Sequence, residues 1–378
     1  MYNHSTETQS RLPILVTGGA GYIGSHVVRA LDRAGFFPIV YDSMLNGHAF
    51  ALGWGSFEHG DVRDEAALRK VFEKWRPAAV MHFAALINVG DSVNIPDVYH
   101  DNNVGGSRCL LNVMRAFDVR RLVFSSTAAV YGNPSRSTPA IPETSALQPV
   151  NPYGDGKLEI EKAIASACEN GELEAVVFRY FNAAGASLDA RLGEAHVPET
   201  HLIPIVLERA AGLRADLVLN GNDYATRDGT CVRDYVHVED LADAHLRGLA
   251  RLFRTRAETR DSTPAETRDT VRGEVRAGTY EVFNLGSEAG FTNLEVVRAA
   301  ERVCDRPIPF TWGPRRAGDP ASLIADASLA KRVLGWSPEH SDLETIVRTA
   351  WQWLRRRDRL TAPGKAATSL ESVESADL

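Results

Sequence analysis

The stretch LVTGGAGYIGSH at residues 15–26 joins the end of a short apolar run to a glycine-rich turn and the start of a helical pattern. Read from Gly18 it fits GxxGxxG, and read from Gly19 it fits GxGxxG, and either pattern alone is a weak signal. Its context strengthens it. Such glycines let backbone amides and a helix N-terminus approach a pyrophosphate where a strand precedes the turn and a helix follows. The sequence therefore predicts a dinucleotide-binding unit here.

The same strand and helix rhythm continues along the chain. Apolar runs follow at residues 37–41, 78–83, 122–125 and 175–178, and helical patterns separate them. This alternation predicts an α/β fold with a doubly wound, parallel Rossmann sheet. After Asn182 the rhythm weakens and glycine-rich loops mix with short elements, which indicates a smaller α/β substrate-binding lobe over the carboxyl ends of the strands.

Composition narrows the class of protein. The chain has 378 residues, 44% of them hydrophobic, and a net charge of 42 minus 49, or -7. Without a global basic field, neither nucleic acid nor a membrane is expected as a partner. No run approaches the roughly 18 apolar residues of a membrane span and the N-terminus is polar, so the cytoplasm is the expected location. The four cysteines form no CxxC pair, and we expect neither a disulfide framework nor a metal site.

A carboxylate follows the second expected strand at the position that selects the cofactor. Asp42 lies 18 residues after Gly24. It can accept hydrogen bonds from both hydroxyls of an adenosine ribose and would repel a 2'-phosphate, which predicts NAD rather than NADP. Asp61 and Val62, after another expected strand, are a candidate edge for the adenine. The small residues of HFAA at 82–85 allow close approach of the cofactor.

Tyr153-x-x-x-Lys157 is the strongest catalytic pattern in the chain. Tyrosine has a pKa of roughly 10, so its use near neutrality requires about 4 kcal/mol of phenolate stabilisation. A lysine ammonium roughly 4 Å away supplies about that much, and a cationic nicotinamide ring would add to it. Asn151 as cap and Pro152 at the helix start place Tyr153 in the first turn, with Lys157 on the same face. A surface i,i+4 pair is the alternative. Thr127, at the end of the SST strand, makes a redox active site the better interpretation.

Several motifs together indicate a family. VTGGAGYIGSH, HFAALINVGDSV, DNNVGGS, FSSTAAVYG, NPYGDGK, FRYFNAAGA, RDYVHVEDLADAH, FNLGS and PRRAGDP occur in order between residues 12 and 353. In these motifs the chain resembles the extended short-chain dehydrogenase/reductases, and within them the nucleotide-sugar epimerases of the UDP-galactose type. The resemblance implies interconversion of UDP-galactose and UDP-glucose by transient oxidation at carbon 4 of the sugar with bound NAD. It also implies a homodimer through helices near 104–117 and 157–168.

The resemblance implies a role for each matching residue. Tyr153 is the catalytic base, Lys157 is its electrostatic partner and a contact of the nicotinamide ribose, and Thr127 shares the hydrogen bond of the sugar 4-hydroxyl. The implied cofactor contacts are Gly18, Gly21, Tyr22, Ile23, Gly24, Asp42, Asp61, Val62, Phe83, Ala84, Asn102, Lys157 and Tyr180. The implied UDP-sugar contacts are Thr127, Tyr153, Asn182 at a phosphate, His201 and Leu202 at the uridine, Arg233 and Arg316 as the diphosphate clamp, and Asp319 at the ribose.

The expected domain organisation follows. Residues 255–276 hold a highly charged near-repeat almost without large apolar side chains, which indicates a solvated insertion, and the polar residues 361–378 indicate a disordered tail. The remaining expected regions are a flexible leader at 1–10, a NAD-binding Rossmann domain at 11–182 with 232–252 returning to it, and a nucleotide-sugar-binding lobe at 183–231 and 278–356.

Some positions depart from the family pattern. Thr127 replaces the commoner serine, and because either hydroxyl can donate and accept, its role is expected to survive. Gly156 replaces a serine beside the lysine, where glycine lowers helix stability by up to about 1 kcal/mol. Ile87 stands where some members carry a lysine that contacts the cofactor. Leu323 falls where the family sets the room for the sugar 2-substituent, and its intermediate size leaves N-acetylated substrates open beside glucose and galactose. A UDP-pentose is a further alternative substrate.

Other functions fit less well. A nucleotide-sugar dehydratase needs an Asp-Glu pair after the strand-end threonine, where this chain has Ala128-Ala129. An NAD-sensing regulator would have little use for Thr127, Tyr153 and Lys157 together. A plain dehydrogenase shares these residues and would be distinguished by net release of reduced cofactor.

Overall fold

The computed structural model describes residues 11–134, 140–261, 278–316 and 319–361. The expected leader, most of the expected insertion and all but the first residue of the expected tail lie outside these residues. Among the described residues, no helix is both long and apolar enough to cross a membrane.

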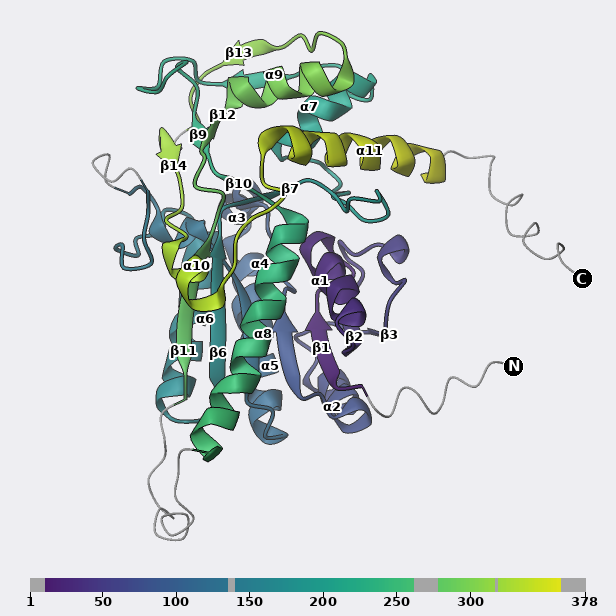
Figure 1. Cartoon of the computed structure of the whole chain (residues 1–378), viewed down its shortest axis with the longest axis vertical. Coiled ribbons are helices and arrows are strands. Elements are labelled where there is room, and N and C mark those ends of the chain that lie inside the picture. The colour runs from purple at the N-terminus through teal and green to yellow at the C-terminus, as the bar shows by residue number, and fades with distance from the viewer. Residues whose placement is uncertain (1–10, 135–139, 262–277, 317–318, 362–378) are drawn as a thin grey trace, which may run out of the picture.

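A seven-stranded sheet forms the centre of the larger part of the molecule (Figure 1), and every pair of neighbouring strands is parallel. Its strand order is β11-β6-β5-β4-β1-β2-β3. The chain therefore adds β2 and β3 on one side of β1 and the later strands, beginning with β4, on the other side. The predicted doubly wound Rossmann fold is confirmed. The strands are β1 (Pro13–Thr17), β2 (Phe37–Asp42), β3 (Ser56–His59), β4 (Ala79–His82), β5 (Arg121–Thr127), β6 (Glu174–Tyr180) and β11 (Tyr280–Leu285).

Helices cover both faces of this sheet, as its uninterrupted apolar strands require. In β1, Ile14 and Val16 face one hydrophobic core and Leu15 faces the other, and all three are fully buried. Helices α1 (Tyr22–Arg33), α8 (Val238–Asp261) and α10 (Ser328–Leu334) contribute to the first core, and α2 (Glu65–Trp75), α5 (Gly106–Ala116) and α6 (Pro152–Glu169) to the second. Short helices α3 (Val89–Asn94) and α4 (Pro96–Tyr99) and a π-helical segment (His100–Gly105) lead into α5.

A smaller lobe lies beyond one end of the sheet (Figure 1). Its helices α7 (Leu202–Ala211), α9 (Asn293–Cys304) and α11 (Leu343–Thr361) share a third hydrophobic core. Three small sheets border it. β7 (Asn182–Ala184) pairs with β10 (Tyr235–His237), β9 (Val232–Arg233) lies between β12 (Phe291–Thr292) and β14 (Ser322–Leu323), and β8 (Val218–Asn220) pairs with β13 (Thr311–Gly313).

The assignment of residues 278–356 to the smaller lobe needs correction. Strand β11 pairs with β6 along its whole length and closes one edge of the large sheet. Ala330 and Leu334 of α10 are buried in the core between that sheet and α8. The chain thus returns to the Rossmann sheet twice, because β6 would otherwise expose an unpaired apolar edge. Helix α8 extends to Asp261, into the expected insertion.

Candidate active site

One cavity of about 1080 Å³ lies between the carboxyl ends of the large sheet and the smaller lobe. Ligand pockets usually occupy about 300–1,000 Å³, so this cavity is large enough for a dinucleotide and a second ligand. Each residue expected to bind or catalyse lies on its wall. These residues are Gly18, Gly21, Tyr22, Ile23, Gly24, Asp42, Asp61, Val62, Phe83, Ala84, Asn102, Thr127, Tyr153, Lys157, Tyr180, Asn182, His201, Leu202, Arg233, Arg316 and Asp319.

The glycine-rich turn presents an uncapped helix end to the cavity. Gly21 is the N-cap of α1, it makes no side-chain capping bond, and the first turn holds no acidic residue, so backbone N–H groups stay available to an anion. Gly18 has φ of 71°, and a Cβ on it would lie 2.5 Å from the backbone nitrogen of Ala84. A Cβ on Gly24 would lie 2.2 Å from the carbonyl oxygen of Gly18. The turn therefore adopts this backbone only with glycine at these positions.

Asp42 ties this turn to the second strand. Its two carboxylate oxygens accept hydrogen bonds from the backbone N–H of Ala20 at 3.0 Å and of Met44 at 2.9 Å. A carboxylate offers about four acceptor sites, so further lone pairs remain for ribose hydroxyls. At the expected adenine edge, the Asp61 carboxylate is paired with Arg63 at 2.6 Å, and the hydrogen bond from that guanidinium lowers the pKa of Asp61. Because this carboxylate is already paired, the main chain and the side chain of Val62 remain as the surface that an adenine ring could contact.

Tyr153 lies in the first turn of α6, as predicted. The Asn151 side chain accepts a hydrogen bond from Gly154 N–H at 2.8 Å, and Pro152 occupies the first helical position. The side chain of Thr127 lies near the phenol of Tyr153 and acts to lower the pKa of that phenol. Because Thr127 Oγ1 accepts from Ala129 N–H at 3.1 Å, its hydroxyl proton is free to be donated toward the phenol.

The electrostatics of this pair differ from expectation. Burial raises the pKa of Tyr153 to about 12, and the Thr127 side chain only partly opposes it. The Lys157 ammonium donates to the carbonyl oxygen of Ser125 at 2.8 Å and lies 6.0 Å from the centroid of the Tyr153 ring. Burial also lowers the pKa of Lys157 to about 8. From the sequence, the lysine charge, with a cationic nicotinamide ring adding to it, is expected to make this phenol acidic. Here the desolvation of Tyr153 outweighs the more distant lysine charge.

The opposite wall carries the residues expected to contact the nucleotide. Arg233 forms an ion pair with Asp319 and also donates to the carbonyl oxygen of Pro320 at 3.0 Å. Arg316 is exposed at the cavity rim. His201 is the N-cap of α7 without a side-chain capping bond, so that helix also points an uncapped N-terminus at the cavity. The wall thus combines a fixed guanidinium, an exposed one and a positive helix end.

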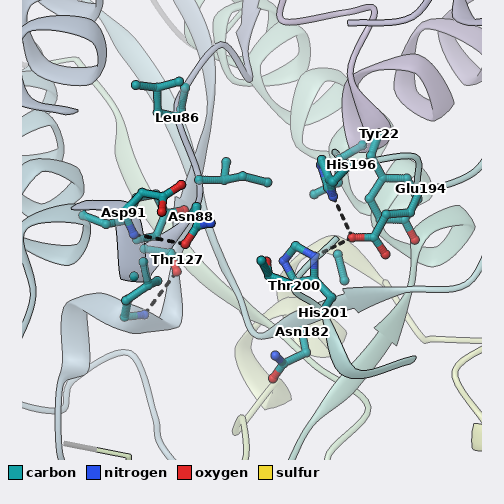
Figure 2. A pocket seen from close by; sticks show the side chains of 18 of the residues that line it. Tyr22, Leu86, Asn88, Asp91, Thr127, Asn182, Glu194, His196, Thr200 and His201 are labelled. Atoms are coloured by element: carbon teal, nitrogen blue, oxygen red, sulfur yellow. Dashed lines mark hydrogen bonds and ion pairs between the residues drawn. The ribbon is translucent and has the colours of Figure 1, made fainter. Parts of the chain in front are cut away.

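Sequence reasoning missed several residues on this wall. Glu194 and His196 line the cavity beside His201, and Figure 2 shows both imidazoles directed at the Glu194 carboxylate. Burial alone would lower the pKa of His201, but Glu194 and Glu199 outweigh it and raise that pKa to about 10. The spacing E-x-H-x-x-E-x-H over 194–201 was the available signal. Leu217, residues 218–220 of β8 and the loop residues 45–47 also line the cavity, and no motif marks them.

A doubly wound sheet with a Tyr-x-x-x-Lys pair beside a dinucleotide turn defines the extended short-chain dehydrogenase/reductase class. The chain belongs to the NAD dependent epimerase/dehydratase family, which matches residues 14–258. The family predicted from the motifs is confirmed.

Within this family, the chain is similar to individual UDP-glucose 4-epimerases. A UDP-glucose 4-epimerase of Rhizobium leguminosarum bv. trifolii is 45% identical over 340 residues, covering 90% of this chain and 96% of the relative. One from Halalkalibacterium halodurans is 46% identical over 342 residues, covering 90% and 95%. The crystal structure of UDP-glucose 4-epimerase from Brucella ovis in complex with NAD is 43% identical, covers 90% of this chain and 97% of its own, and has a TM-score of 0.82. The activity implied by the motifs is the one these relatives carry.

Proposed function

We propose that this chain is a UDP-sugar 4-epimerase that interconverts UDP-galactose and UDP-glucose with NAD as a bound cofactor. The observation that carries the proposal is the position of Tyr153 and Thr127 between a dinucleotide turn and an arginine-bearing wall in one cavity. The UDP-glucose 4-epimerases at 45% and 46% identity support it. So do structures of relatives with NAD, and one from Stenotrophomonas maltophila with NAD and a formylated UDP-arabinopyranose, 37% identical.

The cofactor is held by residues that the cavity already arranges. The free amides at the N-terminus of α1 bind its pyrophosphate, Asp42 accepts hydrogen bonds from the adenosine ribose, and Lys157 contacts the nicotinamide ribose. When bound, NAD supplies the acceptor that takes the hydride from carbon 4 and later returns it to the opposite face of the sugar. Its positive ring would also place a charge near Tyr153, which favours the phenolate.

The residues of the chain move the proton and hold the sugar. Tyr153 removes the proton of the sugar 4-hydroxyl through the hydrogen bond it shares with Thr127, and returns it after the hydride has been returned. Arg233 and Arg316 hold the diphosphate throughout, so the hexose can turn about its link to the diphosphate and present its other face. The carbon is inverted without net oxidation.

Leu323 supports glucose and galactose as the sugars. It lies in β14 on the cavity wall and packs against the small hydrophobic cluster that includes Ala128, Tyr131 and Leu158. A packed leucine leaves less room than a glycine or alanine for an N-acetyl group. We expect Leu323→Ala to raise the activity with UDP-N-acetylgalactosamine relative to UDP-galactose, and an unchanged ratio would remove this role.

We also propose a homodimer in which α5 and α6 of the two copies pack together. In one copy these helices share a shallow groove whose walls include the partly exposed Leu111 and Ala163. Light scattering after size exclusion should give twice the mass of the 41.3 kDa chain. Substitution of Ala163 by Arg should shift the protein toward the monomer, since a charge would have to be buried in the interface.

The decisive test of function uses purified protein, UDP-galactose and no added NAD, with UDP-glucose measured by a coupled assay. We expect turnover that added NAD changes little, because the cofactor stays bound. Stoichiometric release of reduced cofactor would instead identify a dehydrogenase, and loss of water from the sugar a dehydratase.

A further inference from the structure

We propose that Glu194, His196, Glu199 and His201 form a binding site for one divalent transition-metal ion, with Zn²⁺ the best match. Their ligand atoms, two carboxylate oxygens and two imidazole nitrogens, all lie within 4.8 Å of one another. Tetrahedral zinc holds such atoms at about 2.0–2.2 Å, so they lie roughly 3.3–3.6 Å apart around the ion. Small side-chain rotations are enough to reach that geometry.

The protons available in the cluster do not satisfy its buried carboxylates. His201 Nδ1 lies 2.7 Å from Glu194 Oε1 and 3.0 Å from Glu199 Oε1, yet an imidazole nitrogen carries a single hydrogen. His196 Nδ1 lies 2.9 Å from the same Glu194 oxygen (Figure 2), so two imidazole nitrogens meet at one carboxylate oxygen. The Glu194 and Glu199 carboxylates share one donor, His201 Nδ1. A divalent cation between them would neutralise both negative charges.

A second, independent observation points to a ligand. Glu199 Oε2 is buried and has no hydrogen-bond partner, while its side chain is 3% exposed. His196 Nδ1 lies 3.9 Å from this oxygen, beyond hydrogen-bonding distance. A buried carboxylate oxygen without a partner is costly. It faces the cluster, and an ion there would supply the missing interaction.

The surroundings fix the ligands and favour a transition metal. Glu199 Oε1 accepts from the backbone N–H groups of Thr200 at 2.7 Å and His201 at 2.8 Å, which orients this carboxylate. Trp353 Nε1 of α11 donates to the carbonyl oxygen of Glu194 at 2.8 Å and anchors that end of the segment. Two imidazoles favour Zn²⁺ over Mg²⁺ or Ca²⁺, which prefer oxygen ligands. The expectation of no metal rested on the cysteines, and this site uses none.

The ion would fix the segment 194–201 between the two halves of the cavity. Its ligands lie beside the first turn of α1, where the rings of Tyr22 and His196 meet edge to face with centroids 6.4 Å apart. At the other end, His201 occupies the N-cap position of α7. Binding replaces the protons shared by the imidazoles and carboxylates, so the ion competes with protons. We expect it to act as a structural clamp on this wall.

The test measures zinc directly on the full chain. Protein stripped with a chelator is titrated with ZnCl₂ against a chromophoric competitor, the bound metal is counted by mass spectrometry, and Co²⁺ is used to record the visible absorption of a tetrahedral site. We expect one equivalent bound to the wild type, a rise in the thermal midpoint with zinc concentration, and a tetrahedral Co²⁺ spectrum.

Two variants remove single ligands. The first variant, Glu199→Gln, keeps an oxygen that can accept hydrogen bonds from the N–H groups of Thr200 and His201, so it should fold. The second variant is His196→Gln. Each should weaken zinc binding about 100-fold or more, since even outer-shell partners contribute 10–100-fold. Glu159→Gln, in the exposed pair with His100 at 3.3 Å, should bind as the wild type does. No equivalent bound to the wild type, or equal binding by Glu199→Gln, would overturn the proposal.

Discussion

The Nζ atom of Lys157 donates to the main-chain carbonyl oxygen of Ser125 at 2.8 Å, so strand β5 and not the phenol of Tyr153 holds this ammonium. The side-chain hydroxyl of Ser125 in turn contacts the hydroxyl of Tyr180. The lysine is thus pre-positioned beside the cofactor region of the cavity. In the proposed mechanism, the positive ring of the bound cofactor adds a charge that favours the phenolate.

Tyr153→Phe should fold and bind NAD but lose at least about 100-fold in kcat, because general acid–base catalysis contributes roughly 10²–10⁴-fold. Steady-state kinetics with UDP-galactose and the absorbance of bound cofactor give both quantities. Tyr280→Phe, which removes a phenol that does not line the cavity, is the matched control. A near-normal rate in Tyr153→Phe would refute the assigned base.

The stability of the cofactor-free protein should reflect the buried lysine. The pKa of Lys157 falls from 10.5 to about 8, so between these values the unfolded chain binds more protons and stability rises with pH. Relative to Lys157→Met, the free energy of unfolding should increase by about 3 kcal/mol from pH 8 to pH 10.5, at 1.36 kcal/mol per unit, and the gain is lost as the pH falls through 8. Urea denaturation across this range measures it. The exposed Lys162→Met should track the wild type.

Asp42→Asn should weaken NAD binding by about 10–100-fold, since a hydrogen bond to a charged group contributes roughly 1.5–3 kcal/mol. NADP should be affected less, because the carboxylate repels its 2'-phosphate in the wild type. Fluorescence titration of cofactor-free protein with NADH and NADPH gives both dissociation constants. Asp64→Asn, which alters the cap of α2 outside the cavity, serves as the control. Equal affinities of the wild type for the two cofactors would contradict this role of Asp42.

Arg316→Met should raise KM for UDP-galactose about 10-fold or more without changing NAD affinity, because a charge-assisted contact to the diphosphate is lost. The neighbouring Arg315 pairs with Asp223 at 2.6 Å, packs over the Tyr224 ring and does not line the cavity. Arg315→Met is therefore a closely matched control. If both variants shift KM equally, the clamp is not at Arg316.

Local sequence rules determined the elements that carry this site. Asn151 and Pro152 specify a helix start through capping and a fixed φ, and the glycines of the first turn permit a backbone that other residues cannot adopt. The apolar runs of the strands specify a sheet buried on both faces, because only covered parallel strands need such runs. These signals act over a few residues, so one sequence was enough to predict them.

Only the tertiary structure decided what depends on neighbours distant in the chain. Residues 280–285 complete the large sheet beside β6 rather than the smaller lobe. The pKa of Tyr153 is raised by burial that no motif reports, and Arg233 meets Asp319 across 86 residues of chain. Glu194 and Glu199 gather around His201. Desolvation and the choice of an ion-pair partner are set by what packs against a group, and that packing arises only when distant segments fold together.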